Sequence, residues 1–174
     1  DLANKVYRVW RNNTPNRSRG VRITVSTSYF VPKSHTPFQW EGQNTQEEYL
    51  RKVTLLRENL RNKSITYNWH DPETSFLEAV LSRGDRRIAD VIEEAWRHGA
   101  KFDSWSEYFS LQTWMDAFAA CGVDPTFYAN RLRDREEVFP WTVISDGVTG
   151  KFLWREREQA YAGKITPDCR EKCS

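Results

Sequence analysis

One segment of this chain has the pattern of a long β-strand, and helical patterns surround it. From Val21 to Val31, β-branched and aromatic residues alternate with other residues, and a period of two predicts a strand. Ser64 to Trp69 is a second, shorter candidate. A lone strand cannot satisfy its own edge N–H and C=O groups. We therefore expect a mainly α fold with an α/β remnant, whose long strand finds its partners in a longer parent chain.

Capping residues and prolines predict where the helices begin. Thr45 and Glu48 form a capping box before an apolar stripe that reaches about Arg61. Asp71-Pro72 places a capping carboxylate before a proline suited to a first helical turn, and Gly84 ends that helix. Further helices are expected near residues 2–10, 85–99, 110–122, 124–128 and 149–162, and an extended segment at residues 140–147. The helices before and after Gly84 are expected to form a hairpin.

The composition is that of a globular chain rather than a membrane or disulfide-rich one. The chain has 174 residues, and its 24 aromatic rings offset a hydrophobic content of only 39%. No apolar run approaches the roughly 20 residues that cross a bilayer, and no signal-peptide pattern opens the sequence. Cys121, Cys169 and Cys173 are too few for a secreted disulfide framework. We expect a cytoplasmic protein with no membrane partner.

The near-neutral net charge of +2 hides an uneven distribution. Residues 1–45 carry seven Lys and Arg against two acids, a net charge of +5, and the remainder carries −3. Between Asp1 and Glu41 there is no acid, but there are five arginines at positions 8, 11, 17, 19 and 22. Such a segment is either a solvated surface or a contact for nucleic acid. The second reading is an alternative function: a noncatalytic helical module that binds RNA or protein, with bases stacked on exposed rings.

Motifs of common catalytic sites are absent, but one loop has the ingredients of a site. There is no glycine-rich phosphate loop, no His/Glu zinc motif and no Ser/His/Asp elbow. After the long strand, Pro32 and Pro37 stiffen a loop that presents four candidate residues: Lys33, His35, Thr36 and Trp40. Polar tips and an aromatic wall at the carboxyl end of a strand suit a binding site. The same loop could equally be a connection whose rings only pack.

Two further places hold residue types that bind metals or transfer protons. His70 lies beside Asp71 and could act as a general base or a ligand, although Asp71 also suits a helix cap. Cys169 and Cys173 are four residues apart and could share a metal ion. Zinc and iron–sulfur sites generally need three or four ligands. These two cysteines are therefore either partial metal ligands or idle thiols.

The segment Ser26 to Trp40, STSYFVPKSHTPFQW, resembles a known family. It is similar to the end of the radical S-adenosylmethionine (radical SAM) domain in a family of uncharacterised cobalamin-binding radical enzymes, where a close variant of this stretch closes the barrel. The likeness continues, in order, through residues 69–80, 83–87, 102–107, 127–131, 152–156 and 166–170. It thus covers nearly the whole chain.

The resemblance implies that this chain is the C-terminal part of a larger enzyme. Residues 1–43 would be the last helix, strand and loop of a partial TIM-like barrel, residues 44–163 a mostly helical extension, and residues 164–174 a cysteine-containing tail. The rest of the parent chain, its main partner, would hold a 4Fe-4S cluster, S-adenosylmethionine and cobalamin. We expect the parent to be an Fe-S enzyme and this chain to be catalytically inert alone. The substrate is not implied.

The resemblance also ranks the candidate residues. Lys33, His35 and Thr36 would lie at the carboxyl face of the barrel, where cofactor and substrate are expected. Trp40, His70 and Asp71 are further candidates to face substrate or cofactor. Cys169 and Cys173 would be partial metal ligands in the tail.

Overall fold

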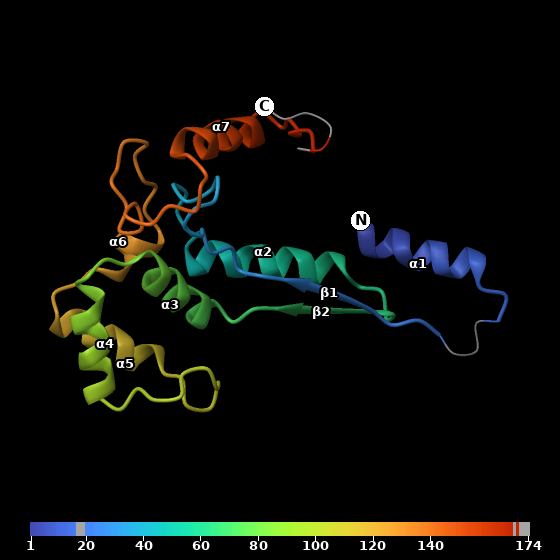
Figure 1. Cartoon of the computed structure of the whole chain (residues 1–174). Helices are drawn as coiled ribbons and strands as arrows, with labels where there is room; N and C mark the ends of the chain where they lie inside the picture. Colours follow the sequence, from blue (N-terminus) through green and yellow to red (C-terminus); the bar gives the residue numbers. More distant parts are fainter. Residues whose placement is uncertain (17–19, 169, 171–174) are drawn as a thin grey trace. The chain divides into compact units, whose positions relative to one another are not determined.

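The computed structural model describes residues 1–16, 20–168 and 170. Within them the fold is mainly helical, with seven helices and one two-stranded parallel sheet, which confirms the expected fold class (Figure 1). The elements are α1 (Leu2–Asn13), β1 (Ile23–Thr27), α2 (Gln46–Asn59), β2 (Ile65–Trp69), α3 (Pro72–Arg83), α4 (Ile88–Arg97), α5 (Leu111–Ala120), α6 (Pro125–Ala129) and α7 (Gly150–Tyr161). None of these helices is long and apolar enough to cross a membrane.

The chain divides into two compact units. The first unit comprises residues 1–30 and 44–75, and the second comprises residues 31–43 and 76–174. The division passes through α3, after Ser75. This division into compact units does not test the domain boundaries expected after residues 43 and 163, which stay predictions.

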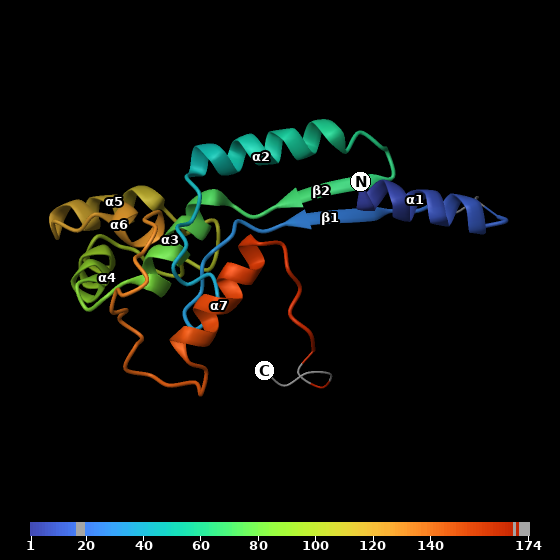
Figure 2. The ribbon, with the colours of Figure 1, turned by 90° about the horizontal axis from the view of Figure 1, so that it is seen from above.

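The first unit is built on a strand–helix–strand motif. β1 pairs with β2 in parallel, from Ile23 opposite Ile65 to Thr27 opposite Trp69. α2 connects the two strands and runs alongside them in both views (Figures 1 and 2). A core of Tyr29, Tyr49, Val53 and Tyr67 joins the helix to the sheet segment. The expectation that the long strand has no partner in this chain is therefore wrong, because the short candidate at Ser64–Trp69 supplies one.

β1 is shorter than the alternating pattern that predicted it. The pattern runs from Val21 to Val31, but the strand covers only Ile23–Thr27. Its partner explains the length, because β2 is also five residues long. One further bond, from the His70 N–H to the Thr27 carbonyl at 3.2 Å, closes the ladder. Local alternation thus marked an extended chain, and pairing decided how much of it is strand.

Side-chain caps begin most of the helices, as the sequence predicts. The Thr45 hydroxyl accepts from the Glu48 N–H at 3.2 Å, and the Asp71 carboxylate accepts from the Thr74 N–H at 2.8 Å. The same device starts α5, α6 and α7 at Ser110, Asp124 and Thr149. Each cap satisfies a backbone N–H that the first helical turn leaves unpaired.

The core of the second unit gathers the four central helices. Phe76 and Val80 of α3, Val91 of α4, Phe118 of α5 and Ala129 of α6 are buried together. α4 packs most closely against α5, so the expected hairpin of the helices before and after Gly84 is not the main helix pair. Residues 140–147 were expected to be extended, but residues 140–143 form turns, with the Ile144 N–H donating to the Trp141 carbonyl at 3.0 Å.

Candidate functional site

The loop of residues 33–41 is held in successive tight turns. The Thr36 hydroxyl donates to the Lys33 carbonyl at 2.8 Å, and the Gln39 N–H donates to the Thr36 carbonyl at 3.1 Å. His35 has a φ of 55°, in the left-handed region that residues other than glycine rarely adopt. Such strain persists where the surrounding contacts over-determine the backbone, which is common at ligand sites.

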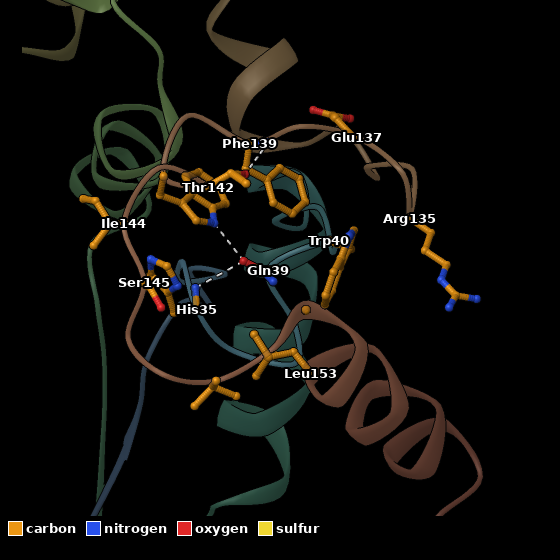
Figure 3. Close-up of a pocket in the computed structure, with 13 residues that line it drawn as sticks. His35, Gln39, Trp40, Arg135, Glu137, Phe139, Thr142, Ile144, Ser145 and Leu153 are labelled. Carbon is orange, nitrogen blue, oxygen red and sulfur yellow. Dashed lines mark hydrogen bonds between the residues drawn. The ribbon is translucent and has the colours of Figure 1, made fainter.

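A cavity of about 290 Å³ lies behind this loop (Figure 3). All of its lining residues belong to the second unit, and they come from the loop, from residues 135–148 and from the start of α7. Those used below are His35, Gln39, Trp40, Glu137, Phe139, Trp141 and Leu153. Of the four loop candidates chosen from the sequence, His35 and Trp40 line this cavity.

Gln39 joins the loop to the opposite wall. Its carboxamide oxygen accepts from the Trp141 indole N–H at 2.8 Å and from the His35 backbone N–H at 3.2 Å (Figure 3). The side chain is almost fully buried, with 5% of its surface exposed. Sequence reasoning missed this residue, because its partner Trp141 is 102 positions away in the chain. A polar residue between Phe38 and Trp40 was the only available signal.

Aromatic rings form much of the cavity wall. Trp40, with 4% of its surface exposed, packs in one cluster with Phe139 and Leu153. The Phe139 and Trp141 rings stack, with centroids 4.8 Å apart and an angle of 21°. Trp154 meets Trp40 edge to face at 5.1 Å. The candidate Trp40 is therefore a wall residue, fixed by packing on several sides.

A group of arginines supports this wall from behind. The Arg133 guanidinium lies 5.4 Å from the Phe139 centroid and 5.3 Å from the Trp141 centroid. Glu137 accepts two bonds from Arg131, both at 2.7 Å, and lies 3.5 Å from Arg133. The hydrogen bonds from Arg131 lower the pKa of Glu137. Glu137 thus stays ionised and offsets part of the positive charge beneath the rings.

Arg83, which the sequence did not suggest, is the largest fully buried side chain of the described residues. Its Nε donates to the Tyr128 carbonyl at 3.0 Å and its Nη1 to the Pro32 carbonyl at 3.5 Å. Burial first, and then the charge of Arg133, lower its pKa to about 10. Arg83 therefore remains charged at neutral pH, where it ties α3 to α6 and to the start of the loop.

The remaining loop candidates point elsewhere. Lys33 forms an ion pair with Glu78 of α3, and both side chains are about half exposed. Thr36 uses its hydroxyl on the loop's own backbone. Neither lines the cavity. His35 has a carboxylate nearby, because its Nδ1 lies 3.7 Å from an Asp146 oxygen.

His70 and Asp71 belong to the first unit and directly follow β2. His70 is exposed, and its carbonyl accepts from the Tyr49 hydroxyl at 3.0 Å. Asp71 caps α3, and its Oδ1 also accepts from the Thr74 hydroxyl at 2.9 Å. The capping interpretation of Asp71 is thus confirmed. Because these residues and the cavity belong to different units, they are treated as distinct candidates.

The predicted metal ligands Cys169 and Cys173 lie outside the described residues, as do Arg17 and Arg19 of the basic segment. Among residues 1–16, 20–168 and 170, no three His, Cys, Asp or Glu side chains gather in a way that could hold a metal. Arg8, another arginine of the basic segment, has its Nη2 3.9 Å from an Asp1 carboxylate oxygen.

Two stacked tyrosines beside the end of β1 give the first unit a measurable pH dependence. Tyr29 and Tyr49 stack with centroids 4.2 Å apart, and the Tyr29 hydroxyl donates to the Asn44 carbonyl. Burial, followed by the charge of Tyr49, raises the pKa of Tyr29 to about 12. The folded state thus favours the neutral phenol, so this stabilisation is present below pH 10 and is lost as the pH rises through 12.

We predict that tyrosinate absorbance of the native protein shows a late step near pH 12. Tyr29→Phe should reduce that step by one phenol, because Tyr49 and Tyr128, whose pKa values burial also raises, remain. It should also move alkaline unfolding to higher pH. Tyr108→Phe, at an exposed ring, is the matched control and should leave both unchanged. A late step of unchanged size in Tyr29→Phe would contradict the assignment.

Comparison with known proteins adds no relative to this picture. A scan against protein-family models, a search of curated proteins and a search of solved structures each find no match to this chain. The family resemblance seen in the sequence accordingly stays a prediction. The cavity behind the loop is the feature on which a functional proposal can rest.

Proposed function

We propose that this chain is the C-terminal region of a cobalamin-binding radical SAM enzyme. In this proposal the loop of residues 33–41 and its cavity form one wall of the active site. The observation that carries it is that the segment with the family resemblance folds around a cavity and contributes His35, Gln39 and Trp40 to its lining. The left-handed backbone of His35 and the buried side chain of Gln39 are the further features of this loop on which the proposal draws.

The first unit is compatible with the same proposal. Its parallel strands joined by a helix are the repeating motif of α/β barrels and of other α/β enzymes. In such folds, ligands bind beyond the carboxyl ends of the strands. His70 and Asp71 follow β2 at that end, although Asp71 is occupied as a cap.

The exposed face of α1 supports a larger parent protein. Its apolar residues Leu2, Val6 and Val9 are all exposed, and no residue of α1 is buried. In globular proteins, the apolar stripe of a helix normally faces a hydrophobic core. In the proposal this face packs against the remainder of the parent chain.

The cofactors are assigned to the rest of the parent. The described residues bring together no three-ligand metal site, so they do not fit a 4Fe-4S cluster. S-adenosylmethionine bound to such a cluster is the source of the radical in this class of enzyme. The role proposed for this chain is to bind and orient substrate and to exclude water.

Amide hydrogen exchange tests whether the loop is an active-site wall. In the complete parent protein, anaerobically reconstituted, S-adenosylmethionine and cobalamin should slow exchange in residues 33–41. Residues 88–97 of α4 serve as the internal control and should not change. If the protein binds S-adenosylmethionine by equilibrium dialysis but exchange in the loop is unaffected, the loop is not a wall of that site.

A salt titration tests the alternative, an RNA-binding module. Steep loss of RNA affinity with rising salt would favour it, because phosphate contacts release counterions. No binding at low salt would remove it.

A further inference from the structure

The cavity of the second unit contains one amide group whose orientation is fixed. The Gln39 oxygen must face the Trp141 indole N–H and the His35 backbone N–H, because both groups can only donate. The carboxamide nitrogen therefore lies on the other side and makes neither bond. Figure 3 draws it on the side of Trp40 and Leu153. The pocket thus presents an N–H donor that is already oriented, which lowers the entropy cost of binding an acceptor.

Flat apolar surfaces surround this donor. The stacked Phe139 and Trp141 rings form one side, Trp40 another, and Leu153 adds an aliphatic contact. Aromatic rings pack favourably on planar aromatic partners, in offset-stacked or edge-to-face arrangements. A volume of about 290 Å³ suits a small fused-ring molecule rather than a nucleotide with its phosphates.

The charges around the cavity are largely compensated. Glu137 is bonded to Arg131 and lies near Arg133. The Arg135 Nε lies 3.6 Å from a Glu136 carboxylate oxygen, and the His35 Nδ1 lies 3.7 Å from an Asp146 carboxylate oxygen. One oriented N–H donor, in a site without a dominant charge, favours a neutral ligand that accepts a hydrogen bond.

We propose that this cavity binds a neutral, planar, fused-ring heterocycle whose ring nitrogen or carbonyl oxygen accepts a hydrogen bond from the Gln39 carboxamide nitrogen. Only the identification of this ligand as a substrate rests on the proposed function. Binding itself is a property of the second unit and needs neither cluster nor cobalamin.

Quinoline and naphthalene form a probe pair that isolates the acceptor. They have nearly the same shape, and only quinoline carries a ring nitrogen. Quinoline is titrated into the 174-residue chain at neutral pH and followed by NMR. It should shift the signal of the Trp141 indole N–H. That signal is assigned by its absence from the spectrum of the Trp141→Phe variant. Quinoline should bind about fivefold more tightly than naphthalene, as one neutral hydrogen bond allows.

Gln39→Glu removes the donor and keeps the fold contacts. A carboxylate oxygen can accept the same two bonds from Trp141 and His35, but it has no N–H to offer. The variant should lose the preference for quinoline while the Trp141 signal remains. Gln112→Glu, at an exposed position of α5, is the charge control and should keep the preference.

Three results would overturn the proposal: no binding of either probe up to its solubility, equal binding of both, or an unchanged preference in Gln39→Glu. The first two need no variant, so the test stands even if Gln39→Glu does not fold. Failure to cleave S-adenosylmethionine in the parent protein would remove the proposed function but leave the binding results intact.

Discussion

Arg83→Ala should lower the free energy of unfolding by about 3 kcal/mol. Arg83 is fully buried, and the substitution removes its bonds to the Tyr128 and Pro32 carbonyls. A buried carbonyl left without a donor costs about 1–3 kcal/mol, and the space left by the side chain adds a cavity cost. Urea denaturation followed by tryptophan fluorescence measures the loss, since six of the eight tryptophans belong to the second unit.

Two further variants separate the contribution of the lost hydrogen bonds and charge of Arg83 from that of its lost side-chain volume. Arg97→Ala, at an exposed position of α4, removes only a surface ion pair with Glu93 and should cost less than about 1 kcal/mol. Arg83→Met keeps most of the side-chain volume but removes the charge and the donors. Because burial and Arg133 both disfavour the charge of Arg83, Arg83→Met should cost less than Arg83→Ala. A loss below about 0.5 kcal/mol in Arg83→Ala would show that these bonds do not hold the loop.

Gly42→Ala should lower the free energy of unfolding by about 2–3 kcal/mol. A Cβ atom at Gly42 would lie 2.1 Å from the Asn130 carbonyl oxygen and 2.8 Å from its carbon, both backbone atoms. The two segments cannot easily separate, because the Gln43 N–H donates to the Ala129 carbonyl at 2.8 Å. The Asn130 amide also donates to the Gln43 carbonyl at 3.0 Å. The same urea denaturation experiment measures the change.

Gly150→Ala is the matched control for Gly42→Ala. Gly150 is the first residue of α7, and a Cβ atom there meets nothing within 4 Å. Since alanine favours a helix by up to about 1 kcal/mol over glycine, this variant should be neutral or more stable. Equal effects at both glycines would contradict the close approach between Gly42 and Asn130.

Features set by neighbours in the chain could be predicted from the sequence, and features set by distant partners could not. The helix starts at Thr45, Ser110 and Thr149 were predicted because a cap and its N–H lie within three residues. Both strands have a local pattern, but their pairing was missed because α2 separates them in the sequence. Pairing also depends on α2 bringing the two strands together.

The same distinction applies to the candidate site. His35 and Trp40 were chosen for their residue types and their position after a strand, and both line the cavity. Lys33 was chosen for the same reason, but Glu78, 45 positions later, pairs with it outside the cavity. Gln39 and Arg83 were missed because a buried polar residue is recognisable only through its partners, here Trp141 and Tyr128.

Reductive cleavage of S-adenosylmethionine by the complete parent protein tests the proposed enzyme class most directly. After anaerobic reconstitution with iron and sulfide and addition of a reductant, the account predicts iron–sulfur absorption and equal amounts of methionine and 5′-deoxyadenosine. The hydrogen atom that completes 5′-deoxyadenosine comes from substrate or solvent. A parent protein that binds no cluster, or binds one but forms no 5′-deoxyadenosine, would contradict the proposal that this chain belongs to a radical SAM enzyme.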